Sequence, residues 1–372
     1  MLHHMNYREL DTPALLIDRE ILINNLDSMQ KYADENHVRL RPHTKTHKSP
    51  FPADMQVSRG ALGIAAAKVG EAEVMAENGF SDIFIANEIV GKKKLERVAS
   101  LSQKIQISFG VDCAEYIPQI EQVFAESNST ANILVEIEVG ENRSGVIHEE
   151  DFVSILQAVS RQPHVEFRGI FSHDGNSYAA GNLEECREIA YEAQKRTLHF
   201  AEIAKQNHMP CQIVSYGATP TLMNHVRILE GITELRPGTY ALMDASQANA
   251  VGTLDFCAAT VLATVISKPT DERTILDVGA KGLTMQKRSS GICSSPGMGT
   301  LIDFPNTYID SMFDEHAIIY NRKFHDQVRI GDKVRIIPVH ICPVCNLFDT
   351  AYLISGDEVV EEFPVSCRGK LQ

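Results

Sequence analysis

The chain has 372 residues, of which 44% are hydrophobic and 23% charged, and 35 Lys and Arg against 49 Asp and Glu give a formal net charge of −14. This length excludes a single small module and suits one large α/β barrel with a smaller domain, or two mid-sized domains. The acidic balance, without a long Lys/Arg cluster, argues against a duplex nucleic-acid binder, because such a protein needs a concentrated cationic surface.

The distribution of apolar residues argues against a membrane protein. No stretch approaches the roughly 18 to 20 consecutive apolar residues of a membrane span, and the N-terminal segment lacks the apolar core of a signal peptide. The eight cysteines are irregularly spaced in a long chain, unlike the disulfide framework of a small secreted domain. We therefore expect a cytoplasmic protein with reduced thiols.

The first two thirds of the chain predict repeated βα units. Residues 14–18 form a strand-like run and residues 20–35 a helix, and eight short β-branched or apolar runs then alternate with helical stretches. These eight predicted strands are residues 38–41, 62–66, 82–86, 105–109, 133–139, 167–172, 212–215 and 233–236. Eight parallel strands predict a closed (β/α)8 TIM-type barrel, with a doubly wound open sheet as the alternative.

The pattern changes after residue 246, where strand-like runs are separated by Gly, Pro and Asp turns with little helical periodicity. These runs are residues 260–267, 273–278, 333–339 and 352–355. We therefore predict an α/β barrel over residues 20–246 and a mostly β C-terminal domain over residues 247–372, which also includes residues 1–19.

The loop after the first barrel strand carries two amines and two imidazoles. Active sites of βα barrels lie at the carboxyl ends of the strands, and residues 41–48 (RPHTKTHK) leave the first strand at that end. A lysine such as Lys45 can be desolvated there, which lowers its pKa and lets it serve as nucleophile and base. A solvated basic loop is the alternative.

Two further polar loops follow the fifth and sixth strands. Residues 140–145 place Arg143 between glycines, where it can approach a ligand, and residues 172–178 include His173 and Tyr178. An ordinary polar turn is the alternative for each loop.

The loops after the seventh and eighth strands suit a phosphate. The first contains Ser215, Gly217 and Thr219, and the second contains Gly238 and Tyr240. Small residues let backbone amides reach an anion, and Thr219 can supply a hydroxyl and a helix N-cap. Plain Gly/Pro turns are the alternative. A lysine on the first loop facing a phosphate cup is the layout expected of a pyridoxal 5′-phosphate enzyme.

The C-terminal domain offers possible metal ligands in His340, Cys342 and Cys345. If residues 339–342 continue a strand, His340 and Cys342 lie on the same face and can bind one ion. Thiolate with imidazole suits Zn²⁺, and two protein ligands leave positions open for water or substrate. The alternatives are a redox CxxC, half of a structural zinc knuckle, or a buried cysteine beside a satisfied histidine.

Taken together, these segments resemble the D-serine dehydratase and D-threonine aldolase family, pyridoxal-phosphate enzymes with an alanine-racemase-like barrel and a C-terminal β domain (fold type III). The resemblance runs nearly end to end. The segment Arg-Pro-His-x-Lys-Thr-His and the later His-x-Cys-Pro are specific in combination. The matching segments are residues 11–18, 41–48, 214–221, 234–240 and 340–343.

The resemblance assigns a role to each loop. Lys45 would hold the cofactor, Arg143 would approach its ring, residues 215–219 and 238–240 would hold its phosphate, and a divalent metal, Zn²⁺ by preference, would bind His340 and Cys342. The proton carriers are then left among three candidates, His47, His173 and Tyr178, and Tyr178 is also a candidate for a cofactor contact.

The expected activity is a metal-assisted lyase reaction on a D-configured β-hydroxy amino acid. The loop at residues 172–178 and the His-x-Cys pair look like the dehydratase branch, which favours D-serine or a 3-hydroxyaspartate-type substrate and a 2-oxo acid with ammonia as products. Retro-aldol cleavage to glycine and an aldehyde stays open, as do an amino-acid racemase and a non-catalytic cofactor carrier. By the same resemblance we expect a homodimer with a small-molecule substrate.

Overall fold

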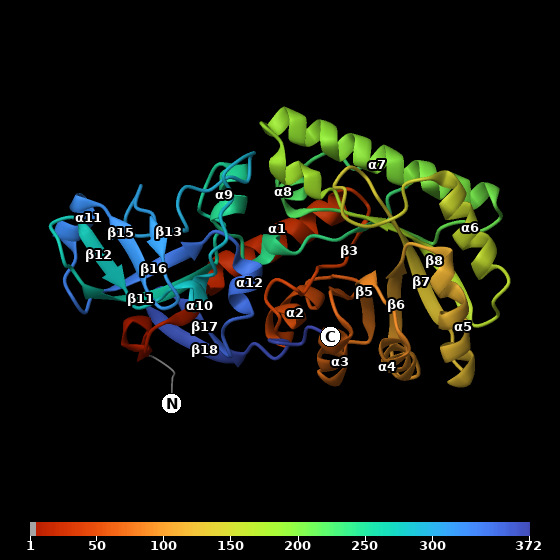
Figure 1. Cartoon of the computed structure of the whole chain (residues 1–372), viewed down its shortest axis with the longest axis horizontal. Coiled ribbons are helices and arrows are strands. Elements are labelled where there is room, and N and C mark those ends of the chain that lie inside the picture. The colour runs from red at the N-terminus through yellow and green to blue at the C-terminus, as the bar shows by residue number, and fades with distance from the viewer. Residues whose placement is uncertain (1–4) are drawn as a thin grey trace.

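The structure is a computed structural model that describes residues 5–372; residues 1–4 of the predicted C-terminal domain lie outside the described residues. Figure 1 shows two parts side by side, a barrel of strands wrapped by helices and a mostly β part that contains the beginning and much of the end of the chain. The predicted fold class, a barrel with a second mostly β domain, is confirmed.

The barrel is one sheet of eight parallel strands in the order β3-β10-β9-β8-β7-β6-β5-β4. An isolated bridge between His43 and Ala65 joins the two end strands, which closes the ring and excludes the open doubly wound sheet. All eight predicted strands are present. Their bounds are β3 Arg39–Leu40, β4 Ile64–Ala66, β5 Asp82–Glu88, β6 Gln106–Val111, β7 Ala131–Ile137, β8 Val165–Ser172, β9 Ile213–Tyr216 and β10 Glu234–Leu235.

Amphipathic helices surround the sheet because their apolar faces repeat at helical spacing. The side chain of Asp18 caps the first of them by accepting a hydrogen bond from the amide of Ile21 at 3.0 Å, as a predicted N-terminus before residue 20 requires. The helices are α1 Arg19–Glu35, α2 Pro50–Val57, α3 Val69–Glu77, α4 Lys92–Ser102, α5 Ile117–Glu126, α6 Glu149–Val159, α7 Leu183–Gln206, α8 Thr219–Met223 and α9 Ala245–Val251.

The interior of the barrel is filled with side chains. Ala65, Phe84, Leu134 and Phe171 form one buried cluster, in which the two phenylalanine rings meet edge to face with their centroids 5.1 Å apart. The guanidinium of Arg236 lies over both rings, 5.8 and 5.2 Å from their centroids. This packed layer separates the two ends of the barrel from each other.

The second part is a ten-stranded, mostly antiparallel sheet. Its path is β1-β18-β17-β2-β11-β12-β15-β14, and β16 pairs with both β11 and β13. The strands are β1 Met5–Asn6, β2 Ala14–Asp18, β11 Ala259–Ser267, β12 Arg273–Leu276, β13 Gly299–Leu301, β14 Ser311–Met312, β15 Ala317–Tyr320, β16 Lys333–Pro338, β17 Thr350–Ser355 and β18 Glu358–Pro364. Short helices α10 Ala280–Leu283, α11 Arg322–Gln327 and α12 Ile341–Cys345 connect them.

Residues 14–18 form strand β2, which belongs to the β domain and not to the barrel. It lies between β17, to which it is parallel, and β11, to which it is antiparallel. One continuous apolar core contains Leu15 and Ile17 of β2 together with Leu22 and Leu26 of α1. The two parts of the molecule therefore pack against each other without an intervening linker.

The C-terminal segment returns to the barrel, where Figure 1 shows it ending beside α2 and α3. The amide of Cys367 donates to the carbonyl of Lys48 at 2.9 Å, and the amide of Gly70 donates to the carbonyl of Gln372 at 2.8 Å. Among the helices of residues 5–372, none combines the length and apolar character needed to cross a membrane.

Candidate active site

Lys45 lies at the carboxyl end of β3, where the sequence placed it. Its amide donates to Nδ1 of the buried His43 at 3.3 Å, which fixes the turn of the loop. Burial lowers the pKa of the Lys45 amine. The cations of Arg143 and Arg236 lower it further, while Cys342 and Glu141 oppose them. A lysine with a lowered pKa supplies the neutral amine that a nucleophile or base needs.

The lysine loop meets the C-terminal part of the protein next to this amine. The Thr46 hydroxyl lies 3.3 Å from the Cys342 thiol, and the Thr239 hydroxyl lies 3.5 Å from the same sulfur. Three segments distant in the sequence therefore converge: the loop after β3, the loop after β10, and α12. The structure thus brings Cys342 close to Lys45, as the predicted site requires.

The expectation that His340 and Cys342 share a strand is wrong. β16 ends at Pro338, His340 is the N-cap residue of α12, and Cys342 lies in its first turn. The physical reason is a tertiary contact: the buried carboxylate of Asp244 accepts from the amide of Ile341 at 3.0 Å, which supplies the helix start with an acceptor from outside its own segment.

His340 is oriented as metal-binding histidines commonly are. Its Nδ1 donates to Oε1 of Gln286 at 2.9 Å, because a carboxamide oxygen can only accept, and this leaves Nε2 with a free lone pair. Burial lowers the pKa of His340 to about 4, so the ring is neutral near pH 7. A neutral imidazole and a thiol suit Zn²⁺ in chemistry. In the described chain no group of three or more His, Cys, Asp or Glu forms a metal cluster.

The loop after β9 forms a cradle of backbone amides. Within residues 5–372, the amides of Gly217, Ala218 and Thr219 donate no hydrogen bond to another protein group, and α8 has no side-chain cap. Gly217 has φ +141°, and a Cβ there would lie 2.8 Å from Leu222 Cδ1. Ala218 occupies the N-cap position, so the expectation that Thr219 caps the helix is wrong. Uncommitted amides at a helix start suit a phosphate.

Gly238 brings the loop after β10 against the lysine loop. A Cβ at this position would lie 3.3 Å from His43 Cβ and 3.1 Å from Thr46 Oγ1, so a larger residue would push the two loops apart. The short 3₁₀ helix that follows, Thr239–Ala241, also has no side-chain cap. The cradle and the lysine loop are therefore held at close range.

The hydroxyls of two predicted cofactor-binding residues, Ser215 and Tyr240, form hydrogen bonds within the protein. The Ser215 hydroxyl donates to Glu234 at 2.8 Å and accepts from Arg236 at 2.6 Å, and the residue is fully buried. The buried Tyr240 hydroxyl accepts from Gln56 Nε2 at 3.0 Å. Burial lowers the pKa of Arg236 to about 10, which still leaves it cationic near pH 7.

His47 points away from Lys45. Its Nδ1 accepts from the amide of Ser49 at 3.2 Å, and its Nε2 donates to Oε1 of Gln56 in α2 at 3.3 Å. Because both ring nitrogens are engaged in this buried position, the structure does not bring His47 to the cluster around Lys45. Its contact with Gln56, the residue that also binds Tyr240, gives it a part in positioning the loop.

His173 belongs to the cluster. Its Nδ1 donates to Oε2 of Glu141 at 2.8 Å, which leaves Nε2 free to accept a proton. Burial lowers the pKa of His173, and Glu141 opposes that change. Arg143 lies 3.3 Å from Glu141 and half exposed, and the Tyr178 ring lies 6.3 Å from that of His173 between centroids. Residues from two predicted loops thus come together.

Several members of the site were not found from the sequence. Glu141 lies in the loop at residues 140–145, in which the sequence points only to Arg143. Asp244 and Gln286 act through contacts with residues far along the chain. Arg288 lies 4.8 Å from the Tyr178 ring centroid and donates to Ser246 at 3.1 Å, and within the described chain it has no carboxylate partner. The sequence does not point to Arg288, because residues 284–298 form neither a helix nor a strand and so show no periodic pattern that would place it.

The fold defines an alanine-racemase-like barrel with a second, mostly β domain, and the loop after the first barrel strand carries the buried Lys45. The chain belongs to this family: residues 17–246 match the family described as alanine racemase, N-terminal domain, and residues 258–354 match the family described as putative serine dehydratase domain.

Named relatives cover nearly the whole chain. It is 33% identical to a D-threonine aldolase of Arthrobacter sp. over 364 residues, 97% of this chain and 93% of the relative. The solved structure of D-threonine aldolase from Filomicrobium marinum has 30% identity and a TM-score of 0.89, covering 100% of this chain and 99% of that one. A metal-free form of a D-threo-3-hydroxyaspartate dehydratase variant has 26% identity and a TM-score of 0.90, covering 97% and 98%.

Proposed function

We propose that this protein is a pyridoxal-phosphate-dependent, metal-assisted lyase that acts on D-configured β-hydroxy amino acids. The observation that carries the proposal is the meeting of the lysine loop with α12, where the Thr46 hydroxyl lies 3.3 Å from the Cys342 thiol. An amine of lowered pKa and a pair of soft metal ligands then face one small polar site. The family membership supports the same reaction class.

The residues fit pyridoxal phosphate. Lys45 supplies the amine, and the uncommitted amides of Gly217, Ala218 and Thr219 suit the phosphate. Ser215 and Tyr240 support these loops from behind through their buried hydrogen bonds rather than by direct contact. When bound, the cofactor supplies an electron sink for the carbon that bears the amino group.

The residues also fit a divalent metal, for which we propose Zn²⁺. His340 Nε2 and Cys342 Sγ are the ligands, and Gln286 holds the ring of His340 in the required tautomer. When bound, the metal supplies a Lewis acid for the β-hydroxyl of the substrate. The metal-free form of the related dehydratase supports the presence of a metal in that relative.

The protein groups divide the remaining work. Lys45 takes the proton from the substrate α-carbon, and the burial that lowers the pKa of its amine favours the neutral form that this role needs. His173 Nε2, oriented by Glu141, exchanges a second proton. Arg288, which has no carboxylate partner in the described chain, binds the substrate carboxylate.

Dehydration is the reaction we place first, with D-serine or a 3-hydroxyaspartate-type substrate. It breaks the bonds from the α-carbon to hydrogen and from the β-carbon to the hydroxyl, and the net products are a 2-oxo acid and ammonia. The His-x-Cys ligand pair and the resemblance of the loop at residues 172–178 to the dehydratase branch support it.

Retro-aldol cleavage is the second candidate, favoured by 33% identity to a D-threonine aldolase over 97% of the chain. Here the bond between the α- and β-carbons breaks, a base takes the hydroxyl proton, and the products are glycine and an aldehyde. The neutral His173 could serve as that base, because burial keeps its pKa low.

One assay distinguishes these reactions. The purified protein, supplied with pyridoxal phosphate and Zn²⁺, is incubated separately with D-serine, D-threonine and 3-hydroxy-D-aspartate, and 2-oxo acid, ammonia, glycine and aldehyde are measured. Oxo acid with ammonia supports the dehydratase, and glycine with aldehyde supports the aldolase. Absence of every product with all three substrates would contradict the proposed function.

A homodimer and a cytoplasmic location stay predictions that rest on the family resemblance and on composition. Light scattering of the purified protein would measure the mass of the particle directly.

A further inference from the structure

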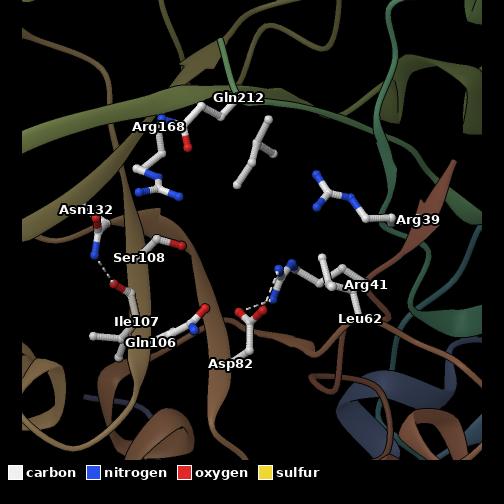
Figure 2. A pocket seen from close by; sticks show the side chains of 11 residues that line it. Arg39, Arg41, Leu62, Asp82, Gln106, Ile107, Ser108, Asn132, Arg168 and Gln212 are labelled. Atoms are coloured by element: carbon white, nitrogen blue, oxygen red, sulfur yellow. Dashed lines mark hydrogen bonds and ion pairs between the residues drawn. The ribbon is translucent and has the colours of Figure 1, made fainter.

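A cavity of about 410 Å³ opens at the amino end of the barrel, and Figure 2 shows the side chains that line it. Most of them come from the first halves of six strands, β3, β5, β6, β7, β8 and β9, while Arg41 lies just after β3, and Leu62 and Gln212 lie just before β4 and β9. Because all barrel strands are parallel, the loop that carries Lys45 leaves from the opposite end. The volume falls within the range of small-molecule sites.

One of the three arginines in the cavity is a fixed part of its wall. The buried Arg41 donates from Nε to Glu234 Oε2 at 2.8 Å and from Nη1 to Asp82 Oδ1 at 2.7 Å. Asp82 is the only carboxylate that lines the described cavity, and it is paired with Arg41, whose guanidinium it shares with the buried Glu234.

The other two arginines are available to a ligand. Arg39 has no ion pair within residues 5–372, and Arg168 has one, to Glu166 at 2.9 Å between side chains that are 35% and 46% exposed. Such a surface pair contributes little and can be exchanged for a better partner. In Figure 2 the guanidinium groups of Arg39 and Arg168 point into the cavity from opposite sides.

Neutral donors complete the lining. The Ser108 hydroxyl and the side-chain amides of Gln106 and Gln212 line the cavity and make no side-chain hydrogen bond in the described chain. The cavity therefore presents Arg39, which has no ion pair in the described chain, and Arg168, whose one ion pair is at the surface, together with several neutral donors that make no side-chain hydrogen bond. This donor set is complementary to oxyanions.

We propose that this cavity is a binding site for a small organic anion with two carboxylate groups. Two further strands, β10 and β9, separate β3 from β8, so at about 4.8 Å per strand the backbones of Arg39 and Arg168 are roughly 14 Å apart along the sheet. One carboxylate can form two parallel hydrogen bonds with one guanidinium, and a dicarboxylate can bind both arginines in this way.

The site is separate from the one around Lys45. The buried cluster that includes Phe84 and Phe171 fills the barrel interior between the two ends, and the Arg236 guanidinium lies over these rings on the way to the lysine loop. The inference therefore does not depend on the proposed reaction.

Calorimetric titration of the cofactor-loaded protein with succinate tests the inference. We expect saturable binding that weakens about tenfold or more in R39Q and in R168Q, since each removes a charge-assisted hydrogen bond. The matched control is R187Q, a change of an exposed arginine on α7 that has no ion pair in the described chain and lies outside the cavity. Acetate, with one carboxylate, should bind at least tenfold more weakly than succinate.

Other outcomes would overturn the inference. Succinate could instead enter the site around Lys45, in which case R288Q would weaken binding and R39Q and R168Q would not. No saturable binding, or equal affinity in all variants, would also overturn it, as would inorganic phosphate binding more tightly than succinate. Unchanged circular dichroism of R39Q and R168Q shows that a loss of binding is not a loss of folding.

Discussion

The Thr46 hydroxyl lies 3.3 Å from the Cys342 thiol, although 296 positions separate the two residues in the sequence. Thr46 adjoins Lys45, and Cys342 is also among the charged groups that act on the pKa of the Lys45 amine, so the lysine loop and the proposed metal ligand lie close together. Neither the barrel nor the β domain alone therefore contains the complete site.

Replacing Lys45 with alanine removes the only group that we assign to hold the cofactor covalently. We expect the visible absorbance of the purified protein to disappear and turnover to fall roughly a thousandfold or more, because the base at the α-carbon is also lost. The Lys93→Ala variant, a change of an exposed lysine in α4, is the control and keeps both properties. Undiminished absorbance in the Lys45 variant would refute the assignment.

Two cysteines in α12, Cys342 and Cys345, serve as test and control for the proposed metal site. We expect Cys342→Ala to purify with little zinc, by elemental analysis, and with greatly reduced turnover. Cys345→Ala should keep its zinc, since Cys345 is buried in the core and burial raises its pKa, which disfavours the thiolate that zinc prefers. A chelator should abolish activity and added Zn²⁺ should restore it. Equal zinc content in the two variants would contradict the assignment.

Glu141 holds His173 and stabilises its protonated form through the 2.8 Å hydrogen bond. In Glu141→Gln the loss of a negative charge lowers the pKa of His173, so the acid limb of the pH–activity profile moves to lower pH. Turnover should fall, because the neutral carboxamide oxygen accepts the hydrogen bond from Nδ1 more weakly than the carboxylate does. Glu150→Gln on α6 serves as control, and superimposable profiles of the wild type and the Glu141 variant would exclude this role.

Arg288 is predicted to act in substrate binding. We expect Arg288→Gln to raise KM about tenfold or more with a much smaller change in kcat, since the carboxylate contact is present before and during the reaction. Arg288→Lys, which keeps the charge, should recover part of the loss. A fall in kcat with an unchanged KM would contradict a role of Arg288 in substrate binding.

The buried His47 predicts a pH dependence of stability. Burial lowers its pKa to about 4 in the folded state, below the ordinary value of 6.5. The unfolded chain therefore binds the proton more readily, so this stability is complete above pH 6.5 and is lost as the pH falls toward 4. Between pH 7 and pH 5 the residue should account for about 2 kcal/mol of the free energy of unfolding.

Urea unfolding of the wild type and of His47→Asn at these two pH values measures that contribution. Asparagine offers an oxygen where Nδ1 accepts from the Ser49 amide, so the local turn has an equivalent acceptor. The variant should lose less stability on acidification than the wild type by about the same amount. Equal losses would show that His47 does not contribute.

The sequence predicts features that depend on local patterns. The eight strands, the helix after Asp18 and the placement of Lys45 at a strand end all follow from periodicity and chain order. The helix at Ile341–Cys345 could not be predicted in this way, because its start is supported by Asp244 at a distance of 97 positions. Local preference alone favoured continuation of β16.

The same reason explains which site residues were missed. Glu141 meets His173 across two different loops, and Gln286 meets His340 across 54 positions. Conversely, His47 is of a type common in active sites but its ring turns toward Gln56. Its loop forms a turn closed by the hydrogen bond from the Lys48 amide to the Thr44 carbonyl, and the ring is buried against α2. Side-chain direction within a polar loop is decided by packing that the sequence alone does not display.

The position of β2 between β17 and β11 makes the barrel an insertion within the β domain, since β2 precedes the barrel along the chain and β11 and β17 follow it. A fragment that starts at residue 247 would lack β2 and would expose the facing edges of β17 and β11. Unpaired edges of this kind template aggregation. The β domain can therefore form its sheet only after the whole barrel has been synthesised, whereas the barrel precedes it on the chain.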